Sequence, residues 1–176
     1  MVAPLSALPV LPPPGEWPFM GRETEIVAAQ TMLARPGAGG VVLVGPAGAG
    51  TSRLVREVLS RAAASGRTVQ AFTATRAAAT IPFGAFAQLL AGHDRRGADR
   101  LELFLAAVEA LGVAGRSTGP GQASAPPRLV VGVDDGHLLD QAGAALLHQL
   151  ASTAAAHVVV GARAGAPAPE PVLALW

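Results

Sequence analysis

A short apolar run, a glycine-rich turn and an amphipathic helix follow one another between residues 41 and 64, and this succession constrains the fold most. Residues 41–44 are continuously apolar and mostly β-branched, which suits a strand buried on both faces of a parallel sheet. The apolar residues of the following helix, predicted at 52–64, recur at helical spacing: Leu54, Val55, Val58, Leu59 and Ala62. A strand that runs through a tight turn into a helix predicts an α/β domain.

Strands and helices alternate along the rest of the chain. Apolar runs predict further strands at residues 68–73, 129–133 and 157–161. Apolar periodicity predicts helices at residues 22–34, 83–91, 99–113 and 138–153. The helix at 22–34 would bury Ile26, Val27, Ala29, Met32 and Leu33, and the helix at 99–113 would bury Leu101, Leu105, Val108 and Leu111. This alternation predicts a three-layer αβα sandwich around a parallel sheet with right-handed crossovers.

The turn after the first strand has the composition of a phosphate-binding loop. Residues 45–52 read Gly-Pro-Ala-Gly-Ala-Gly-Thr-Ser. Glycines let the backbone wrap closely around a phosphate group, and the N–H groups at the start of the next helix favour a negative charge. The hydroxyl of Ser52 is a candidate ligand for Mg²⁺. The predicted nucleotide-binding residues of this loop are Gly45, Ala47, Gly48, Ala49, Gly50, Thr51 and Ser52.

One position of this loop departs from the full phosphate-loop pattern. That pattern, G-x-x-x-x-G-K-[ST], has a lysine that reaches the β- and γ-phosphates. Thr51 stands at the lysine position, and its side chain is short and uncharged. The alternative interpretation of residues 45–52 is a glycine turn that only joins a strand to a helix.

Two carboxylates follow the strand predicted at 129–133. Asp134 and Asp135 would lie at the carboxyl end of a parallel strand, where such sheets bind ligands. In phosphate-loop enzymes the first carboxylate, here Asp134, holds Mg²⁺, and the second, here Asp135, polarises the attacking water. The alternative is a solvated turn or a helix cap, because Asp135 and Gly136 form a turn-like pair.

The strand predicted at 157–161 delivers a basic residue to the same edge of the sheet. Arg163 is a candidate sensor of the γ-phosphate, and a solvated arginine is the alternative interpretation. His137 is interpreted as a polar residue at a helix start. The other histidines, His93, His148 and His157, have no metal-ligand spacing, so Mg²⁺ is the only metal that we expect.

Composition excludes several classes of function. The net charge is +1, and the arginines are spread along the chain, which gives no indication of nucleic-acid binding by this segment. There is no cysteine, which excludes disulfides and is compatible with the cytoplasm. No apolar stretch is long enough to predict a membrane span. We expect residues 1–16 to be a flexible, proline-rich leader, residues 17–176 to form one domain, and the Gly/Ser/Pro-rich stretch 112–128 to be a surface loop.

These motifs together resemble the N-terminal ATPase part of large LuxR-type transcriptional regulators, members of the STAND class of AAA-like NTPases. Residues 19–25 (Phe-Met-Gly-Arg-Glu-Thr-Glu) are similar to the family's opening segment, and residues 81–90 to its P-F-G-x-x-x-x-L-L segment. Residues 130–140 and 158–163 look like its acidic strand and its sensor strand. The resemblance implies that ATP and Mg²⁺ are the cofactors, and that Gly21 and Arg22 lie against the base and ribose.

The resemblance also indicates what the chain would lack. Family members are several times longer, with a fifth core strand, a helical lid and a C-terminal helix-turn-helix that binds DNA. We therefore expect an incomplete domain of about four strands, whose phosphate-loop strand is an exposed edge and a place for self-association. A gene fragment and a degraded relative both agree with this.

Three functions are compatible with the sequence. The leading hypothesis is an ATP-binding regulatory segment of a LuxR-type regulator, a nucleotide-dependent switch with weak or no hydrolysis. The alternative is a degenerate interaction module that has lost the nucleotide. A small independent kinase or ATPase is the third, and the absence of a lid and of a catalytic arginine cluster argues against it.

Overall fold

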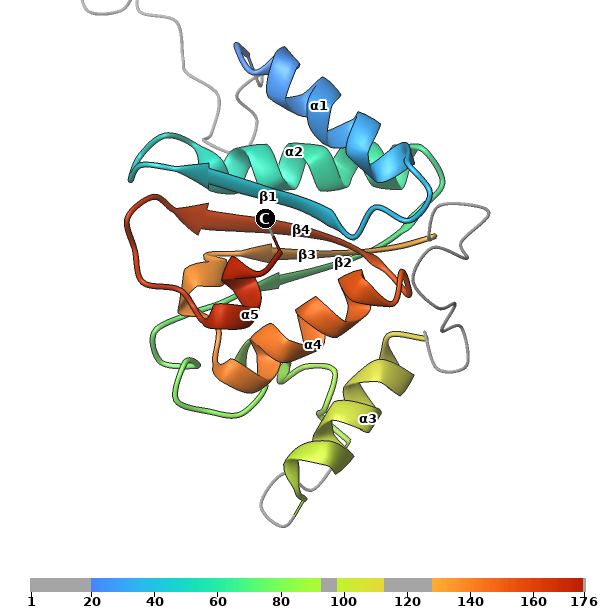
Figure 1. The fold of residues 1–176 in the computed structure, drawn as a ribbon, viewed down its shortest axis with the longest axis vertical. Coiled ribbons are helices and arrows are strands. Elements are labelled where there is room, and N and C mark those ends of the chain that lie inside the picture. The colour runs from blue at the N-terminus through green and yellow to red at the C-terminus, as the bar shows by residue number, and fades with distance from the viewer. Residues whose placement is uncertain (1–19, 93–97, 113–127, 176) are drawn as a thin grey trace, which may run out of the picture.

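The predicted strands pair in one parallel sheet. The computed structural model describes residues 20–92, 98–112 and 128–175, so the expected leader, Phe19, His93 and most of the expected surface loop lie outside the described residues. The strands are β1 (Gly40–Gly45), β2 (Thr68–Thr73), β3 (Leu129–Asp134) and β4 (His157–Arg163). Their order in the sheet is β1-β4-β3-β2, and all three pairings are parallel (Figure 1). The carboxyl ends of all four strands therefore lie on the same side of the sheet, on the left in Figure 1.

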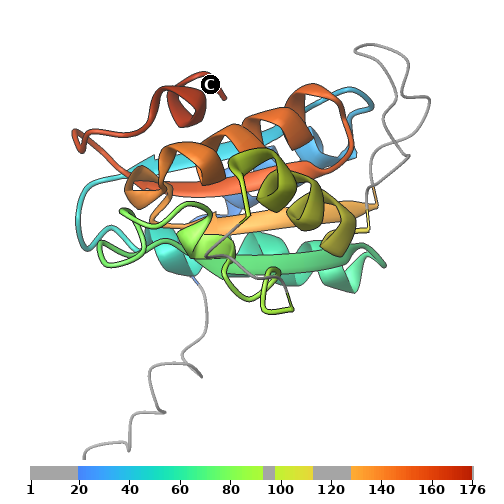
Figure 2. The same cartoon turned by 90° about the horizontal axis from the view of Figure 1, so that it is seen from below.

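Helices cover both faces of the sheet. The helices α1 (Glu23–Ala34) and α2 (Thr51–Ala64) lie on one face. The other face carries α3 (Arg100–Ala110), α4 (Gln141–Ser152) and the short α5 (Glu170–Leu173), as Figures 1 and 2 show. The three-layer α/β prediction is confirmed.

The helix after the glycine turn buries the face that its sequence predicts. All five expected residues of α2 are buried, and they pack with Val130 and Val159 of the sheet. Gly132 shows how close this packing is, because a Cβ at that position would lie 2.3 Å from Leu59 Cδ1. The contact fixes α2, and the loop before it, against the centre of the sheet.

Two helix predictions on the other face were wrong in detail. Residues 83–91 form turns around a short 3₁₀ helix, Gly84–Phe86, instead of an α-helix. Phe83 has a left-handed backbone (φ 54°), and its N–H bonds to a distant carboxylate rather than to a preceding carbonyl. In α3 the expected Leu101 and Leu105 are exposed and the expected Leu111 is buried, and Leu103, Ala106 and Ala107 are buried as well.

The helix predicted at 138–153 is interrupted at its start. A 3₁₀ turn, Gly136–Leu138, comes first, and α4 begins only after Asp140. The buried carboxylate of Asp140 accepts hydrogen bonds from the N–H groups of Ala142 and Gly143, both at 3.0 Å. It also accepts from Phe83 at 3.0 Å and from Gly84 at 3.1 Å. Asp140 therefore caps α4 and ties it to the turns after β2.

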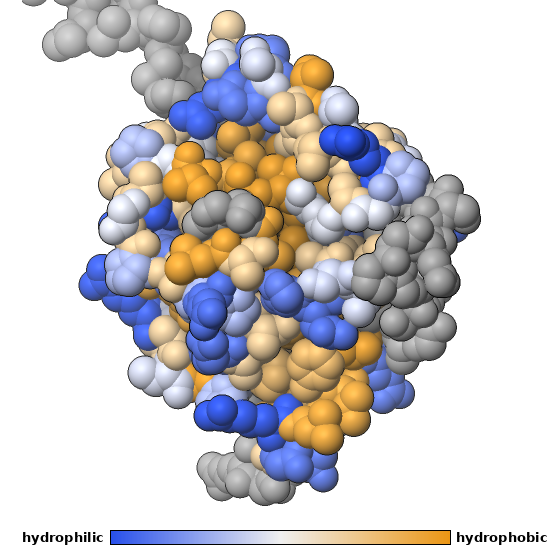
Figure 3. All heavy atoms as spheres, in the orientation of Figure 1, coloured by the Kyte–Doolittle hydropathy of each residue, from blue (hydrophilic) through white to orange (hydrophobic). Residues whose placement is uncertain are grey.

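Among the described strands, β1 is an edge of the sheet, as the sequence led us to expect. β1 pairs only with β4, and Val44 is 54% exposed. Apolar surface gathers over this edge, between α1 and α5 (Figure 3).

At the opposite end of β4, His157 is fully buried and predicts a pH dependence of stability. Its Nδ1 lies 3.1 Å from Nη1 of Arg67. Burial and the charge of Arg67 lower the pKa of His157 from 6.5 to about 4. The folded chain thus binds this proton less well than the unfolded chain. The contribution of neutral His157 to the free energy of unfolding is therefore fully present above pH 6.5, and it is lost as the pH falls toward 4. We expect a loss of roughly 3 kcal/mol in the free energy of unfolding across this window, measured by urea denaturation.

The variant His157→Gln is the control for this prediction. It keeps the other titrating groups but lacks the buried imidazole. We expect its stability to depend less on pH between 6.5 and 4 than that of the wild type. Equal dependence in both proteins would contradict the assignment to His157.

Candidate functional site

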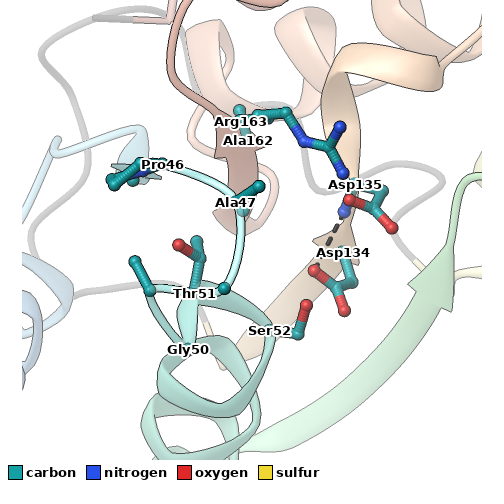
Figure 4. Close-up of a pocket in the computed structure, with 13 residues that line it drawn as sticks. Pro46, Ala47, Gly50, Thr51, Ser52, Asp134, Asp135, Ala162 and Arg163 are labelled. Carbon is teal, nitrogen blue, oxygen red and sulfur yellow. Dashed lines mark hydrogen bonds between the residues drawn. The ribbon is translucent and has the colours of Figure 1, made fainter.

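The carboxyl ends of three neighbouring strands, β1, β4 and β3, surround one pocket. Its volume is about 260 Å³. It is lined by residues 45–52, Asp134, Asp135, Gly161, Ala162 and Arg163 (Figure 4). The structure thus brings together every predicted site residue except Gly21 and Arg22. The sequence did not single out Pro46, Gly161 or Ala162.

The loop between β1 and α2 presents unbonded N–H groups. Gly48 and Gly50 have left-handed backbones, with φ of 79° and 78°, which other residues adopt at a cost. Within the described residues no hydrogen bond engages the backbone N–H groups of Ala47, Gly48, Gly50, Thr51 and Ser52. Such groups, at the positive end of the α2 dipole, form a binding site for an anion.

Thr51 stands at the first position of α2, where the lysine of the full pattern would be. Its Oγ1 is buried and has no hydrogen-bond partner among the described residues. The hydroxyl lies against the loop backbone, because a Cβ at Gly45 would be 2.6 Å from it. A buried, unbonded polar group costs about 1–3 kcal/mol. Because Thr51 is uncharged, the charged side chains that line the pocket are Asp134, Asp135 and Arg163.

The two carboxylates lie across the pocket from the loop. Asp134 Oδ1 accepts a hydrogen bond from the N–H of Asp135 at 2.9 Å, and Asp135 has a left-handed backbone (φ 53°). Gly161 makes room for this arrangement, since a Cβ there would lie 3.2 Å from Asp134 Oδ1. The hydroxyl of Ser52 faces the Asp134 carboxylate (Figure 4).

Arg163 and His137 join the ends of β4 and β3. Nδ1 of His137 accepts a hydrogen bond from the backbone N–H of Arg163 at 3.4 Å, and it lies 4.0 Å from Asp135 Oδ1. Only 7% of the His137 side chain is exposed. Sequence reasoning gave this histidine no role beyond a helix start. Its place two residues after the acidic pair was the available signal.

A comparison with protein-family models decides the family. The model described as AAA ATPase domain matches residues 18–160. The chain belongs to this family. A comparison with curated proteins finds no significant match. In the described part of this AAA ATPase domain, no helix is long and apolar enough to cross a membrane.

Gly21 and Arg22 do not line the pocket of the AAA ATPase domain. The guanidinium of Arg22 donates a hydrogen bond, through Nη2, to the carbonyl oxygen of Ala49. Arg22 therefore contacts the loop from outside. Contact of either residue with a base or ribose stays a prediction.

The residues of the pocket fit a phosphate group and Mg²⁺. AAA ATPase domains generally bind a nucleotide with this ion. The described residues contain no cluster of three or more metal-ligating side chains. Mg²⁺ needs none, because it takes one or two protein ligands and completes its octahedron with phosphate oxygens and water. Ser52 and Asp134 are the residues that would hold it.

Proposed function

We propose that this AAA ATPase domain binds ATP with Mg²⁺ and is the nucleotide-dependent switch of a LuxR-type transcriptional regulator of the STAND class, with weak or no hydrolysis of its own. One observation carries the nucleotide part of the proposal: the unbonded N–H groups of the phosphate loop share one pocket with the Ser52 hydroxyl and the Asp134 carboxylate. The regulator and its class rest on the resemblance of the motifs to that family.

Each side chain of the pocket has a proposed part. The unbonded N–H groups of the loop bind the phosphates, and Ser52 with Asp134 holds the metal. When bound, Mg²⁺ supplies charge neutralisation at the phosphate oxygens. Asp135 orients and polarises a water molecule, and Arg163 contacts the terminal phosphate.

The charge of the pocket supports binding rather than rapid turnover. Two carboxylates and one arginine line it, and no lysine is present at position 51. Negative charge develops on the transferred group and its partners during phosphoryl transfer, and a fixed cation there stabilises it. The same shortage favours the second candidate, an interaction module that keeps this fold without a nucleotide.

Binding of a fluorescent, non-hydrolysable ATP analogue with and without Mg²⁺ tests the proposal. We expect binding that is tighter with Mg²⁺ than without it and that, with Mg²⁺ present, weakens about tenfold or more in Ser52→Ala, which removes a metal ligand. Ser60→Ala is the matched control, because Ser60 is an exposed serine of the same helix outside the pocket. If neither ATP nor ADP binds below millimolar concentrations, the interaction module replaces the proposal.

The proposal extends to partners and place. It puts the domain in the cytoplasm, with no DNA contact by this segment. It also includes self-association through β1, which pairs with β4 on one side and with no described strand on the other. An edge of this kind can pair with β1 of a second copy, antiparallel about a two-fold axis. Sedimentation velocity on the samples of the binding experiment reports this.

A further inference from the structure

The loops that follow β2, β3 and β4 form a second pocket beside the first. Its volume is about 320 Å³, and Arg76, His137 and Arg163 supply its basic side chains. Arg76 lies three residues beyond β2, His137 three beyond β3, and Arg163 ends β4. Because parallel strands end at one edge, three segments distant in sequence deliver nitrogen donors to the same hollow. Arg163 lines both pockets.

The charges of this second pocket are unbalanced. No aspartate or glutamate lines it, and the rest of the lining is apolar, with Leu138, Leu139 and Pro167 among it. Among the described residues no carboxylate lies within ion-pair distance of Arg76 or Arg163. The nearest acidic group to His137, Asp135, lines the first pocket. Two guanidinium groups in a partly apolar hollow attract an anion.

The imidazole of His137 is fixed with a donor available. Its Nδ1 is the acceptor for the N–H of Arg163, so the proton of the neutral ring is on Nε2. Only 7% of the side chain is exposed, and within the described residues no hydrogen bond engages Nε2. A buried ring held in one tautomer, beside two arginines, is preorganised to donate to an oxyanion.

We propose that this second pocket binds the carboxylate or phosphate group of a small-molecule effector, through Arg76, Arg163 and Nε2–H of His137. The site shares Arg163 with the first pocket, but it does not require that the phosphate loop bind a nucleotide.

Titration with two probe anions, inorganic phosphate and malonate, tests the site. The signal is the ring Cε1–Hε1 correlation of His137 in an NMR spectrum of the full chain at constant pH and ionic strength, assigned with His137→Gln. We expect a saturable shift with at least one probe, with a dissociation constant in the millimolar range or below. Saturation by phosphate alone indicates a phosphate-bearing effector, and saturation by malonate alone a carboxylate.

Three variants separate the second pocket from other sites. Arg76→Gln should weaken the titration about tenfold or more, because it removes one charged contact. Ser52→Asp places a carboxylate in the first pocket, on the side of Asp134, and should leave the titration unchanged, as should Arg128→Gln at the far end of β3. Unchanged signals of His148 and His157 report that each variant is folded.

Three results would overturn the site. They are shifts that never saturate, an unchanged titration in Arg76→Gln, and loss of the titration in Ser52→Asp. The last result would place the anion in the phosphate loop.

Discussion

Replacing Thr51 with lysine should tighten the binding of ATP with Mg²⁺ about ten- to a hundredfold. Thr51 is the first residue of α2 and lines the pocket, so a longer side chain there can reach the bound phosphates. A charge-assisted contact contributes about 1.5–3 kcal/mol, which corresponds to one to two powers of ten in affinity. Isothermal titration calorimetry of the wild type and Thr51→Lys with a non-hydrolysable ATP analogue measures the change.

The variant Thr51→Met separates charge from length in this prediction. Methionine has a long, unbranched side chain but no charge, and it also removes the unbonded Oγ1. We expect Thr51→Met to bind no more tightly than the wild type. Equal gains in Thr51→Met and Thr51→Lys would show that relief of the buried hydroxyl, and not the ammonium group, sets the affinity.

The gain should also depend on the metal. In the absence of Mg²⁺ the side chains of the wild-type pocket carry two negative charges and one positive, and Thr51→Lys adds a second positive charge. We therefore expect a larger gain from Thr51→Lys in EDTA than in Mg²⁺. A smaller gain in EDTA would mean that the lysine acts only through the metal-bound nucleotide.

The local apolar pattern was sufficient to predict the buried residues of an element that packs against the sheet along its length. The strand predicted at 68–73 has the bounds of β2, and α2 buries its five predicted residues. The apolar side chains of α2 form one buried cluster with residues of α1 and of the sheet, so the helical spacing of the sequence is also the spacing of the buried face. The same logic brought Asp134, Asp135 and Arg163 to one pocket, because parallel strands have their carboxyl ends together.

Local pattern failed where a distant group decides the backbone. The apolar spacing of Phe83, Phe86 and Leu90, all buried, is compatible with a helix as well as with the observed turns. The N–H of Phe83 donates a hydrogen bond to the carboxylate of Asp140, which lies 57 residues away in the sequence. A local sequence pattern cannot predict that contact. In α3 apolar residues occur on more than one side, so the buried face depends on where α4 lies.

The site shows the same division. The contact of Arg22 with the Ala49 carbonyl joins residues 27 apart, and the bond from the Arg163 N–H to His137 joins residues 26 apart. Neither contact leaves a periodic signal in the sequence. The residue types at both positions were visible, but their partners come only from the fold.

The largest loss of stability that we predict comes from Asp140→Ala. The Asp140 carboxylate accepts from the N–H groups of Phe83, Gly84, Ala142 and Gly143, and only 8% of the residue is exposed. Loss of a helix cap costs about 1 kcal/mol, and each buried N–H left unbonded about 1–3 kcal/mol. We expect a decrease of about 3 kcal/mol or more in the free energy of unfolding, measured by urea denaturation.

The variant Asp99→Ala isolates the capping contribution, because Asp99 caps α3 at an exposed position and, within the part of the chain that the structure describes, bonds to no distant segment. It should cost about 1 kcal/mol. The excess in Asp140→Ala then measures the bonds to Phe83 and Gly84, which hold the turns after β2 against α4. If Asp140→Ala costs no more than Asp99→Ala, those two bonds contribute nothing. Other contacts would then have to hold the turns after β2, which include Arg76, in place.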